Sequence, residues 1–225
     1  GDPARVQSIA RSIAVNCGDP QWGPDSLKAI QNYSLYREFK KQGDSQEDLA
    51  TKVRYYKDAY KGWKYIYVNA PSARETPHLD GSDIFKAYSE AATDESVKNA
   101  YIDSMLAIYD IRLHCFGETA DLSMRKSFAW YSNKNKGNEA YVFNLFNKTV
   151  ELFDSEEGTS KLNISPAFLA PWMIMAIKAN KTAKAIDEEA VFDIFDQINE
   201  IADHNMSEGN SVGKYKGTAD KCFEY

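Results

Sequence analysis

Apolar residues recur along most of this chain at spacings of three and four, the period of a helix with one buried face. No alternating run rich in Val, Ile and Thr is present, so we expect no β-sheet. The sequence therefore predicts an all-α fold. The predicted helices cover residues 28–42, 56–69, 83–92, 94–116, 121–131, 139–154, a stretch from Ser165 onward, and 186–206.

Polar, glycine-containing and proline-containing segments separate these helices. Residues 45–55 are polar and predict an extra turn or a short helix, and residues 78–82 predict a turn. Pro171 removes a backbone donor, so we expect it to kink its helix or to delay the start. Three glycines predict a loose stretch over 207–217, after which residues 218–225 begin another helix.

The segment 94–116 carries two apolar stripes instead of one. Two apolar faces require neighbours on both sides, as for a middle helix in a stacked array. This favours an α-solenoid of antiparallel helix pairs over a closed bundle. The stripes are Ile102, Leu106, Tyr109, Leu113 and Phe116, and Val97, Tyr101, Met105 and Ile108.

The segment 58–71 has the spacing of the second helix of a tetratricopeptide repeat. Ala59 is small and allows close helix approach, Trp63 fills the gap to the next pair, and Ile66 and Pro71 follow at the expected distances. The polar stretch 45–55 then becomes an insertion of about eleven residues into a unit of about 34. The preceding helix supplies the apolar partners Leu35, Tyr36 and Phe39.

Four segments together resemble tetratricopeptide-repeat proteins from the cell envelope of Bacteroidota-type bacteria. They are SLYREFKKQG (34–43), YYKDAYKGWKYIYVNAP (55–71), LDGSDIFKAY (79–88) and YIDSMLAIYDIRLHCFGE (101–118). The resemblance implies an exported α-solenoid scaffold without enzymatic activity or cofactor. We expect residues 1–24 to form an N-terminal segment and residues 25–225 a helical repeat domain, whose array is incomplete at Tyr225.

The net charge and the lengths of the apolar runs limit what this chain can bind or cross. The 225 residues carry a formal charge of −6, which disfavours nucleic acid as a main partner. The longest apolar run, 167–177, is far shorter than the ~20 residues of a transmembrane helix. No signal peptide is visible, but Gly1 before Asp2 and Pro3 suggests that a leader was removed, so this absence does not indicate a compartment. The resemblance to exported proteins implies a periplasmic or outer-membrane-associated location.

Catalytic and metal motifs are weak in this chain. Ser211 lies in a G-x-S-x-G match, but the hydrolase elbow needs a preceding strand and a later histidine, and neither is expected. Asp110 with His114, and Glu200 with His204, are spaced four apart, which is ordinary for hydrogen bonds along a helix. We therefore expect no catalytic, cofactor-binding or metal-binding residues, and no enzyme.

The three cysteines give no disulfide framework. Cys115 is expected to be a small buried apolar residue. Cys17 and Cys222 lie near the two ends and could pair in an oxidising periplasm. A solenoid keeps its ends apart, so this pairing is left open.

Two runs of charge are candidate docking surfaces. A basic run is either a solvated helix face or a patch for an acidic partner or a lipid headgroup; it comprises Lys52, Arg54, Lys57, Lys61 and Lys64. An acidic run without any Lys or Arg between residues 185 and 209 comprises Glu189, Asp193, Asp196, Glu200 and Asp203. We call the second run the acidic ridge.

The acidic ridge is the stronger candidate for partner binding. Like charges four apart destabilise a helix, so the ridge is expected to have a function. We expect it to be centred about 60–90° from an apolar stripe in the same helix, beside the buried face. The alternatives to partner binding are that the ridge serves solubility, or that Lys178, Lys181 and Lys184 neutralise its charge. The stripe is Ile186, Ala190, Ile194, Ile198 and Ala202.

The sequence thus predicts a non-enzymatic protein–protein interaction scaffold of the bacterial cell envelope, with a protein or peptide partner. The alternative is a periplasmic glycan- or nutrient-binding helical protein that works with an outer-membrane transporter. An exposed cluster of Trp and Tyr would favour that alternative. The four Trp residues lie mostly within helix patterns instead.

Overall fold

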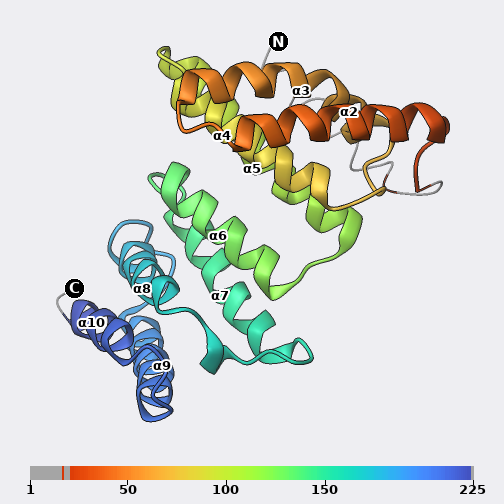
Figure 1. Ribbon diagram of the computed structural model, residues 1–225. Coiled ribbons are helices and arrows are strands. Elements are labelled where there is room, and N and C mark those ends of the chain that lie inside the picture. Colours follow the sequence, from red (N-terminus) through yellow and green to blue (C-terminus); the bar gives the residue numbers. More distant parts are fainter. Residues whose placement is uncertain (1–16, 18–20, 224–225) are drawn as a thin grey trace. The chain divides into compact units, whose positions relative to one another are not determined.

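The computed structural model describes Cys17 and residues 21–223, and these residues form nine α-helices, one short 3-10 helix and no strand (Figure 1). The predicted all-α fold is confirmed. None of these helices has the combined length and apolar character that crossing a bilayer requires. The chain divides into two compact units, residues 1–118 and 119–225, which are described separately.

The first unit is built from helices that pack on their neighbours in sequence. α3 packs against α2 and α4, and α4 also packs against α5. Aspartates at the N-caps of three of these helices accept hydrogen bonds from the backbone of the first turn. The four helices are α2 (Ser26–Asp44), α3 (Leu49–Asn69), α4 (Thr76–Ala91) and α5 (Glu95–Phe116).

The connection between α2 and α3 is shorter than predicted. Asp48 caps α3 by accepting a 2.8 Å hydrogen bond from the Thr51 N–H, so the helix begins at Leu49. Val53, in the added part of the helix, is buried beside Tyr56. The prediction of an eleven-residue insertion over 45–55 was therefore wrong, because burial of a few residues stabilises a helix that looks polar along its length.

The predicted turn at 78–82 is also helical, and it lies inside α4. Pro77 occupies the first helical turn, where its missing N–H costs nothing. His78, Asp80 and Gly81 are all buried. Packing against neighbouring helices thus overrides the weak local propensity of a sequence with Gly, Asp and Ser.

The second unit is a further chain of packed helices around one apolar core. α7 packs on α6 and α8, and α8, α9 and α10 contact one another. Phe146, Phe168, Trp172 and Ile198 are almost fully buried in that core. Its elements are α6 (Ala120–Lys134), α7 (Glu139–Ser155), the 3-10 helix η1 (Lys161–Asn163), α8 (Pro166–Lys181), α9 (Glu188–Ser207) and α10 (Val212–Phe223).

Two expectations about the second unit differ from the structure. Of the two alternatives at Pro171, a delayed start is wrong, because α8 starts at Pro166 and continues through Pro171. The stretch 207–217 is not loose throughout, because α10 begins at Val212. Tyr215 anchors α10: its side chain is buried, and its hydroxyl donates a 2.8 Å hydrogen bond to the carbonyl of Ile164. One buried aromatic residue thus overrides a glycine-rich sequence.

Candidate functional site

The residues of the repeat signature form part of the core of the first unit. Ala59, Trp63 and Ile66 on α3 are at most 1% exposed. The indole of Trp63 stacks on Tyr67 with a centroid distance of 4.8 Å, and its N–H donates a 2.6 Å hydrogen bond to the carbonyl of Pro77. Trp63 therefore joins α3 to α4.

The partners expected on α2 differ in their exposure. Tyr36 is buried and Phe39 is half-buried, but Leu35 is 56% exposed and is not part of the core. Adjacent helical residues point about 100° apart, so Leu35 faces outward when Tyr36 faces inward. A close approach of α2 and α3 occurs at Gly62, where a β-carbon would lie 2.8 Å from the Asn32 carbonyl oxygen. This close approach was predicted at Ala59 instead.

A buried charge network on α2 and α4 was not predicted. Asp80 is 5% exposed and accepts hydrogen bonds from the Tyr36 hydroxyl at 3.1 Å and from the Arg37 guanidinium. Lys40, 2% exposed, donates to Asp44 at 2.6 Å and lies 3.8 Å from Asp80. Burial raises the pKa of Tyr36 far above its usual range, and Asp80 adds to this effect. The network holds α2 to α4.

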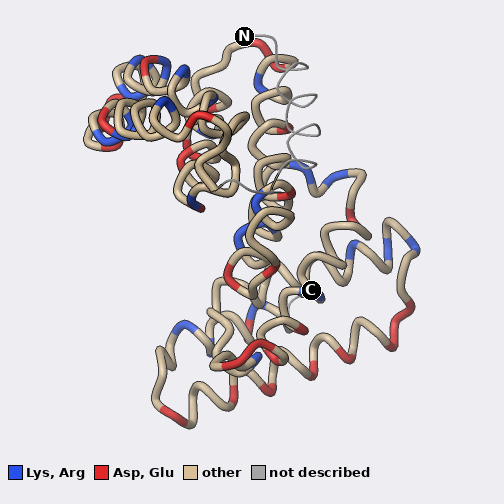
Figure 2. Tube along the Cα trace, turned by 90° about the vertical axis from the view of Figure 1, so that its right-hand side faces the viewer, with Lys and Arg blue, Asp and Glu red and all other residues tan. Residues whose placement is uncertain are grey.

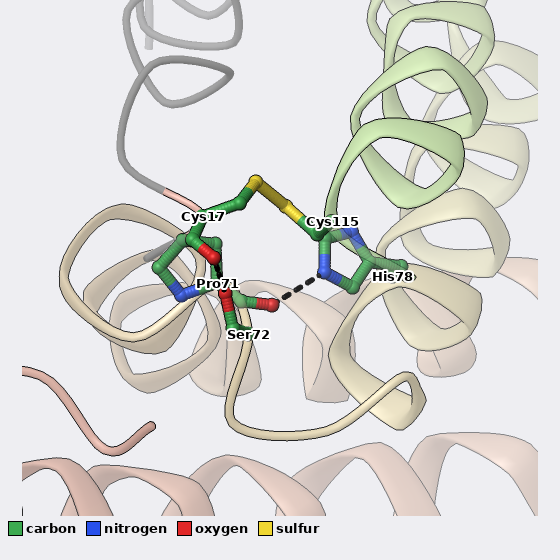
Figure 3. Close-up of a disulfide and its surroundings, with 5 residues drawn as sticks. All are labelled: Cys17, Pro71, Ser72, His78 and Cys115. Atoms are coloured by element: carbon green, nitrogen blue, oxygen red, sulfur yellow. Dashed lines mark hydrogen bonds between the residues drawn. A yellow bond between two sulfur atoms is a disulfide. The ribbon is translucent and has the colours of Figure 1, made fainter. Parts of the chain in front are cut away.

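Cys17 forms a disulfide with Cys115 at the end of α5, with Cα atoms 5.0 Å apart (Figure 3). The Ser72 hydroxyl donates a 2.7 Å hydrogen bond to the carbonyl of Cys17. The prediction that Cys115 is a small buried apolar residue was wrong, because Cys115 is half-buried and disulfide-bonded, and the possible pair Cys17–Cys222 does not form. Cys222 is a free, buried thiol. The two bonded cysteines are 98 residues apart, so only the tertiary fold brings them together.

His78 lies beneath this disulfide and joins α4 to the preceding turn (Figure 3). Its Nε2 lies 2.8 Å from the carbonyl oxygen of Pro71, and its ring contacts Tyr67 and Phe116 edge-on. Burial lowers the pKa of His78 to about 4, while the bond to Pro71 acts in the opposite direction. The imidazole is therefore neutral at pH 7, and Nε2 is the donor in this bond.

The weak catalytic and metal candidates do not gather into a site. Ser211 has φ 47° and precedes α10, but the element before it is the helix α9 and not a strand. Glu200 lies 3.1 Å from Lys161. Within Cys17 and 21–223, no group of three or more His, Cys, Asp or Glu could hold a metal ion.

The aromatic residues that would support glycan binding are largely internal. Trp63 and Trp172 are each 1% exposed, and Trp22 and Trp130 are half-buried. Trp172 donates a 2.7 Å hydrogen bond to Asn147, and Trp63 donates to Pro77. Neither buried indole is available to stack on a sugar.

The acidic ridge lies on the outer face of α9, and all five of its residues are exposed. The ridge is centred about 160° around the helix from the buried residues, so it lies opposite the core and not beside it as predicted. Figure 2 shows acidic residues along α9 without any basic residue between them. The buried residues of α9 are Ile194, Ile198, Ile201, Ala202 and Asn205.

The ridge is little neutralised by lysines of the same chain. Among the described residues, the ion pair Glu200–Lys161 is the one that involves the ridge. Lys178 donates to Asn135 at 3.1 Å instead, and neither Lys181 nor Lys184 pairs with the ridge. The charge of the ridge is therefore available to a partner.

An apolar groove of about 450 Å³ lies between α8, α9 and α10, and it was not predicted. Phe192 at its edge is 67% exposed, while Met173 and Cys222 are buried. Sequence spacing could show an apolar residue on α9 but not which helices would face it. The groove is lined by Met173, Ile177, Asn180, Lys181, Glu188, Val191, Phe192, Phe195 and Cys222.

The basic run of α3 is spread over its exposed and half-buried positions. Arg54 lies over the ring of Tyr55 at 5.4 Å, and Lys57 and Lys61 are exposed. Lys52 and Lys64 are half-buried. This arrangement fits a solvated helix face.

Comparisons with protein families, with curated proteins and with solved structures found no match to the chain. The acidic ridge and the adjacent groove are two exposed features of α9 that a partner could contact.

Proposed function

We propose that this protein is a non-enzymatic interaction scaffold of the bacterial cell envelope, in which tetratricopeptide-like helix pairs stack as an α-solenoid. The acidic ridge on α9 is its docking surface for a basic protein or peptide. The observation that carries the proposal is the exposure of five carboxylates on one helix face, with a single ion pair to Lys161 among the described residues.

Electrostatics supports a basic partner. Like charges four residues apart in a helix cost a few tenths of a kcal/mol per pair, so the ridge weakens α9 slightly. A surface of one sign attracts an oppositely charged partner and speeds its association. A partner that brings Lys or Arg to the ridge removes the repulsion as it binds.

The disulfide supports an exported protein. Disulfides persist in oxidising compartments such as the bacterial periplasm and are rare in the cytosol. Cys17 and Cys115 are bonded, and the bond closes a loop that includes α2, α3, α4 and most of α5. A periplasmic or outer-membrane-associated location is therefore part of the proposal.

Charge reversal on the ridge tests the proposal. We expect the triple variant Asp193→Lys, Asp196→Lys, Glu200→Lys to keep its helical circular dichroism and to lose the partner captured from an envelope extract. Raising the salt from ~50 mM to ~500 mM should release the partner from the wild-type protein as the Debye length shrinks. The loss of the exposed pair Glu200–Lys161 should cost at most about 1 kcal/mol of folding stability.

A matched control keeps the total charge change the same. The variant Glu47→Lys, Glu90→Lys, Glu151→Lys reverses three exposed acidic residues outside the ridge. We expect this control to capture the partner as the wild type does. If the ridge variant also captures it, with the same salt dependence, the ridge is a solvated face and the proposal is wrong.

A further inference from the structure

The apolar groove and the acidic ridge are two adjoining surfaces of α9. Going around the helix, the groove residues Val191 and Phe195 are followed by Phe192, and Phe192 is followed by Asp196 and Glu189. Phe192 therefore lies at the border of the two surfaces, with 67% of its surface exposed. An aromatic side chain so exposed beside an open groove is typical of an interaction site.

We propose that this groove binds an amphipathic helix of the partner, with the helix's apolar residues in the groove and its Lys or Arg residues along the acidic ridge. This inference rests on the proposed function of the ridge and adds the chemistry of its partner. Apolar and electrostatic contacts would then lie side by side on α9, which is the arrangement that helix-in-groove recognition uses.

The dimensions of the groove fit a helix. Its α9 wall runs from Glu188 to Phe195, which is about 10 Å along the helix axis at 1.5 Å per residue. A partner helix places apolar side chains at positions i, i+4 and i+7 over that length. Met173 of α8 and Cys222 of α10 are buried lining residues, and Ile177 and Phe195 are half-buried.

The charges around the groove fix which side of the partner is basic. The α9 side continues into the acidic ridge, where Glu189, Asp193, Asp196 and Asp203 form no ion pair with any described residue. The α8 side carries Lys181, which repels a basic residue. The partner helix is therefore basic along one flank of its apolar stripe and not along the other.

A synthetic helix tests this inference on the full chain. The probe is an 18-residue peptide with Leu at helical spacing and Lys along one flank, and its binding is followed by fluorescence anisotropy. Two control peptides are a scrambled sequence of the same composition and a version with Glu in place of Lys. We expect each control to bind at least about tenfold more weakly, because each lacks one of the two contacts.

Two protein variants separate groove from ridge. Phe192→Ala should weaken binding of the Lys peptide by about tenfold or more, as for a central aromatic residue of an interface. Leu27→Ala is the matched control, because Leu27 is 68% exposed on α2, and it should change nothing. Both side chains are largely exposed, so neither variant should unfold the protein.

The thiol of Cys222 reports occupancy of the groove directly. It is the one free cysteine of the chain, and burial raises its pKa to about 11. We expect the Lys peptide to slow the alkylation of Cys222 by N-ethylmaleimide severalfold. A peptide that binds through the ridge alone would leave this rate unchanged.

The outcomes distinguish this inference from the proposed function. One outcome is binding that depends on Asp193, Asp196 and Glu200, is unchanged by Phe192→Ala and leaves Cys222 unprotected. That result would reject the groove as the binding site and would retain the ridge. Equal binding of the Lys and Glu peptides overturns the ridge as a docking surface. A concentration-dependent dimer that Phe192→Ala dissociates, without peptide binding, assigns the groove to a second copy and also overturns the inference.

Discussion

Trp63 on α3 lies directly against Gly81 on α4: a β-carbon added to Gly81 would lie 2.5 Å from Cζ2 of the indole. Glycine is usually unfavourable inside a helix, by about 1 kcal/mol relative to alanine. Here the absence of a side chain at Gly81 leaves the space that the indole occupies. The indole N–H donates its hydrogen bond to the carbonyl of Pro77, one turn earlier in α4. The two helices are thus fitted to each other at this pair.

Gly81→Ala should therefore destabilise the protein by about 1–3 kcal/mol through overpacking, although alanine is the better helix former. Trp63→Ala should cost about 3–5 kcal/mol because it leaves a large cavity. The control is Gly213→Ala in α10, where an added β-carbon meets nothing within 4 Å, so no loss of stability is expected. Urea unfolding measures all three, and wild-type stability of both core variants would reject this packing.

Asp80→Ala should destabilise the protein by about 3–5 kcal/mol, because it leaves part of a buried charge network without its partner. The Asp80 side chain is 8% exposed and that of Lys40 is 3% exposed. Asp83→Ala serves as the control, since Asp83 contacts the same lysine at 3.2 Å but its side chain is 61% exposed. We expect the control to cost at most about 1 kcal/mol. If both variants lose the same free energy of unfolding in urea, the burial of Asp80 does not add to its contribution to stability.

His78 should make stability fall in weak acid. Burial lowers its pKa to about 4, below the 6.5 of an unfolded chain, so between these values the unfolded state binds a proton that the folded state excludes. The contribution of His78 is fully present above pH 6.5 and is lost as the pH falls toward 4. The loss should reach about 3 kcal/mol, at about 1.4 kcal/mol per pH unit.

His78→Gln isolates this effect from the titration of other groups. Arg112 and Glu75 lie close enough to His78 to influence its pKa, but they are present in both proteins. The difference between the unfolding free energies of wild type and variant, measured from pH 7.5 to pH 4, should therefore shrink as the pH falls. A constant difference would mean that His78 titrates normally.

Reduction of the disulfide should destabilise the first unit. The bond closes a loop between residues 98 apart, and loss of such a bond typically costs about 2–5 kcal/mol through the entropy of the unfolded chain. Dithiothreitol should lower the melting temperature of the wild type but not that of Cys17→Ser, Cys115→Ser. The control Cys222→Ser should respond to dithiothreitol like the wild type.

Helices with strong local signals could be predicted from the sequence. The expected helix 94–116 matches α5, because Asp94 caps its start and Gly117, at φ 84°, follows its end. The start of α4 could not be predicted, since its stability comes from His78, Asp80 and Gly81 facing other helices. The disulfide was missed for the same reason: it depends on contacts between residues far apart in sequence.

The acidic ridge was visible from spacing, because charge and helical period are both local properties. Its orientation was predicted wrongly, because at 100° per residue the ridge is centred about 140° from the apolar stripe and not 60–90° from it. Ile201 and Asn205 lie within the angular range of that stripe, so the buried face stays where the stripe predicts it. The groove required knowledge of where α8 and α10 lie. Exposure of Phe192 could have been predicted from spacing, because the helical period places this residue about 160° from the apolar stripe.

The bond between Cys17 and Cys115 also changes what a protease can do to this protein. Most of the chain of the first unit lies between the two sulfur atoms, so a single cut in the connection 45–48 or in the turn around Ser72 yields two pieces that stay covalently joined. The helices α2 to α5 could then reassemble as one molecule after being nicked. Backbone cleavage and separation of the pieces are therefore two different events, and the second also requires a reductant.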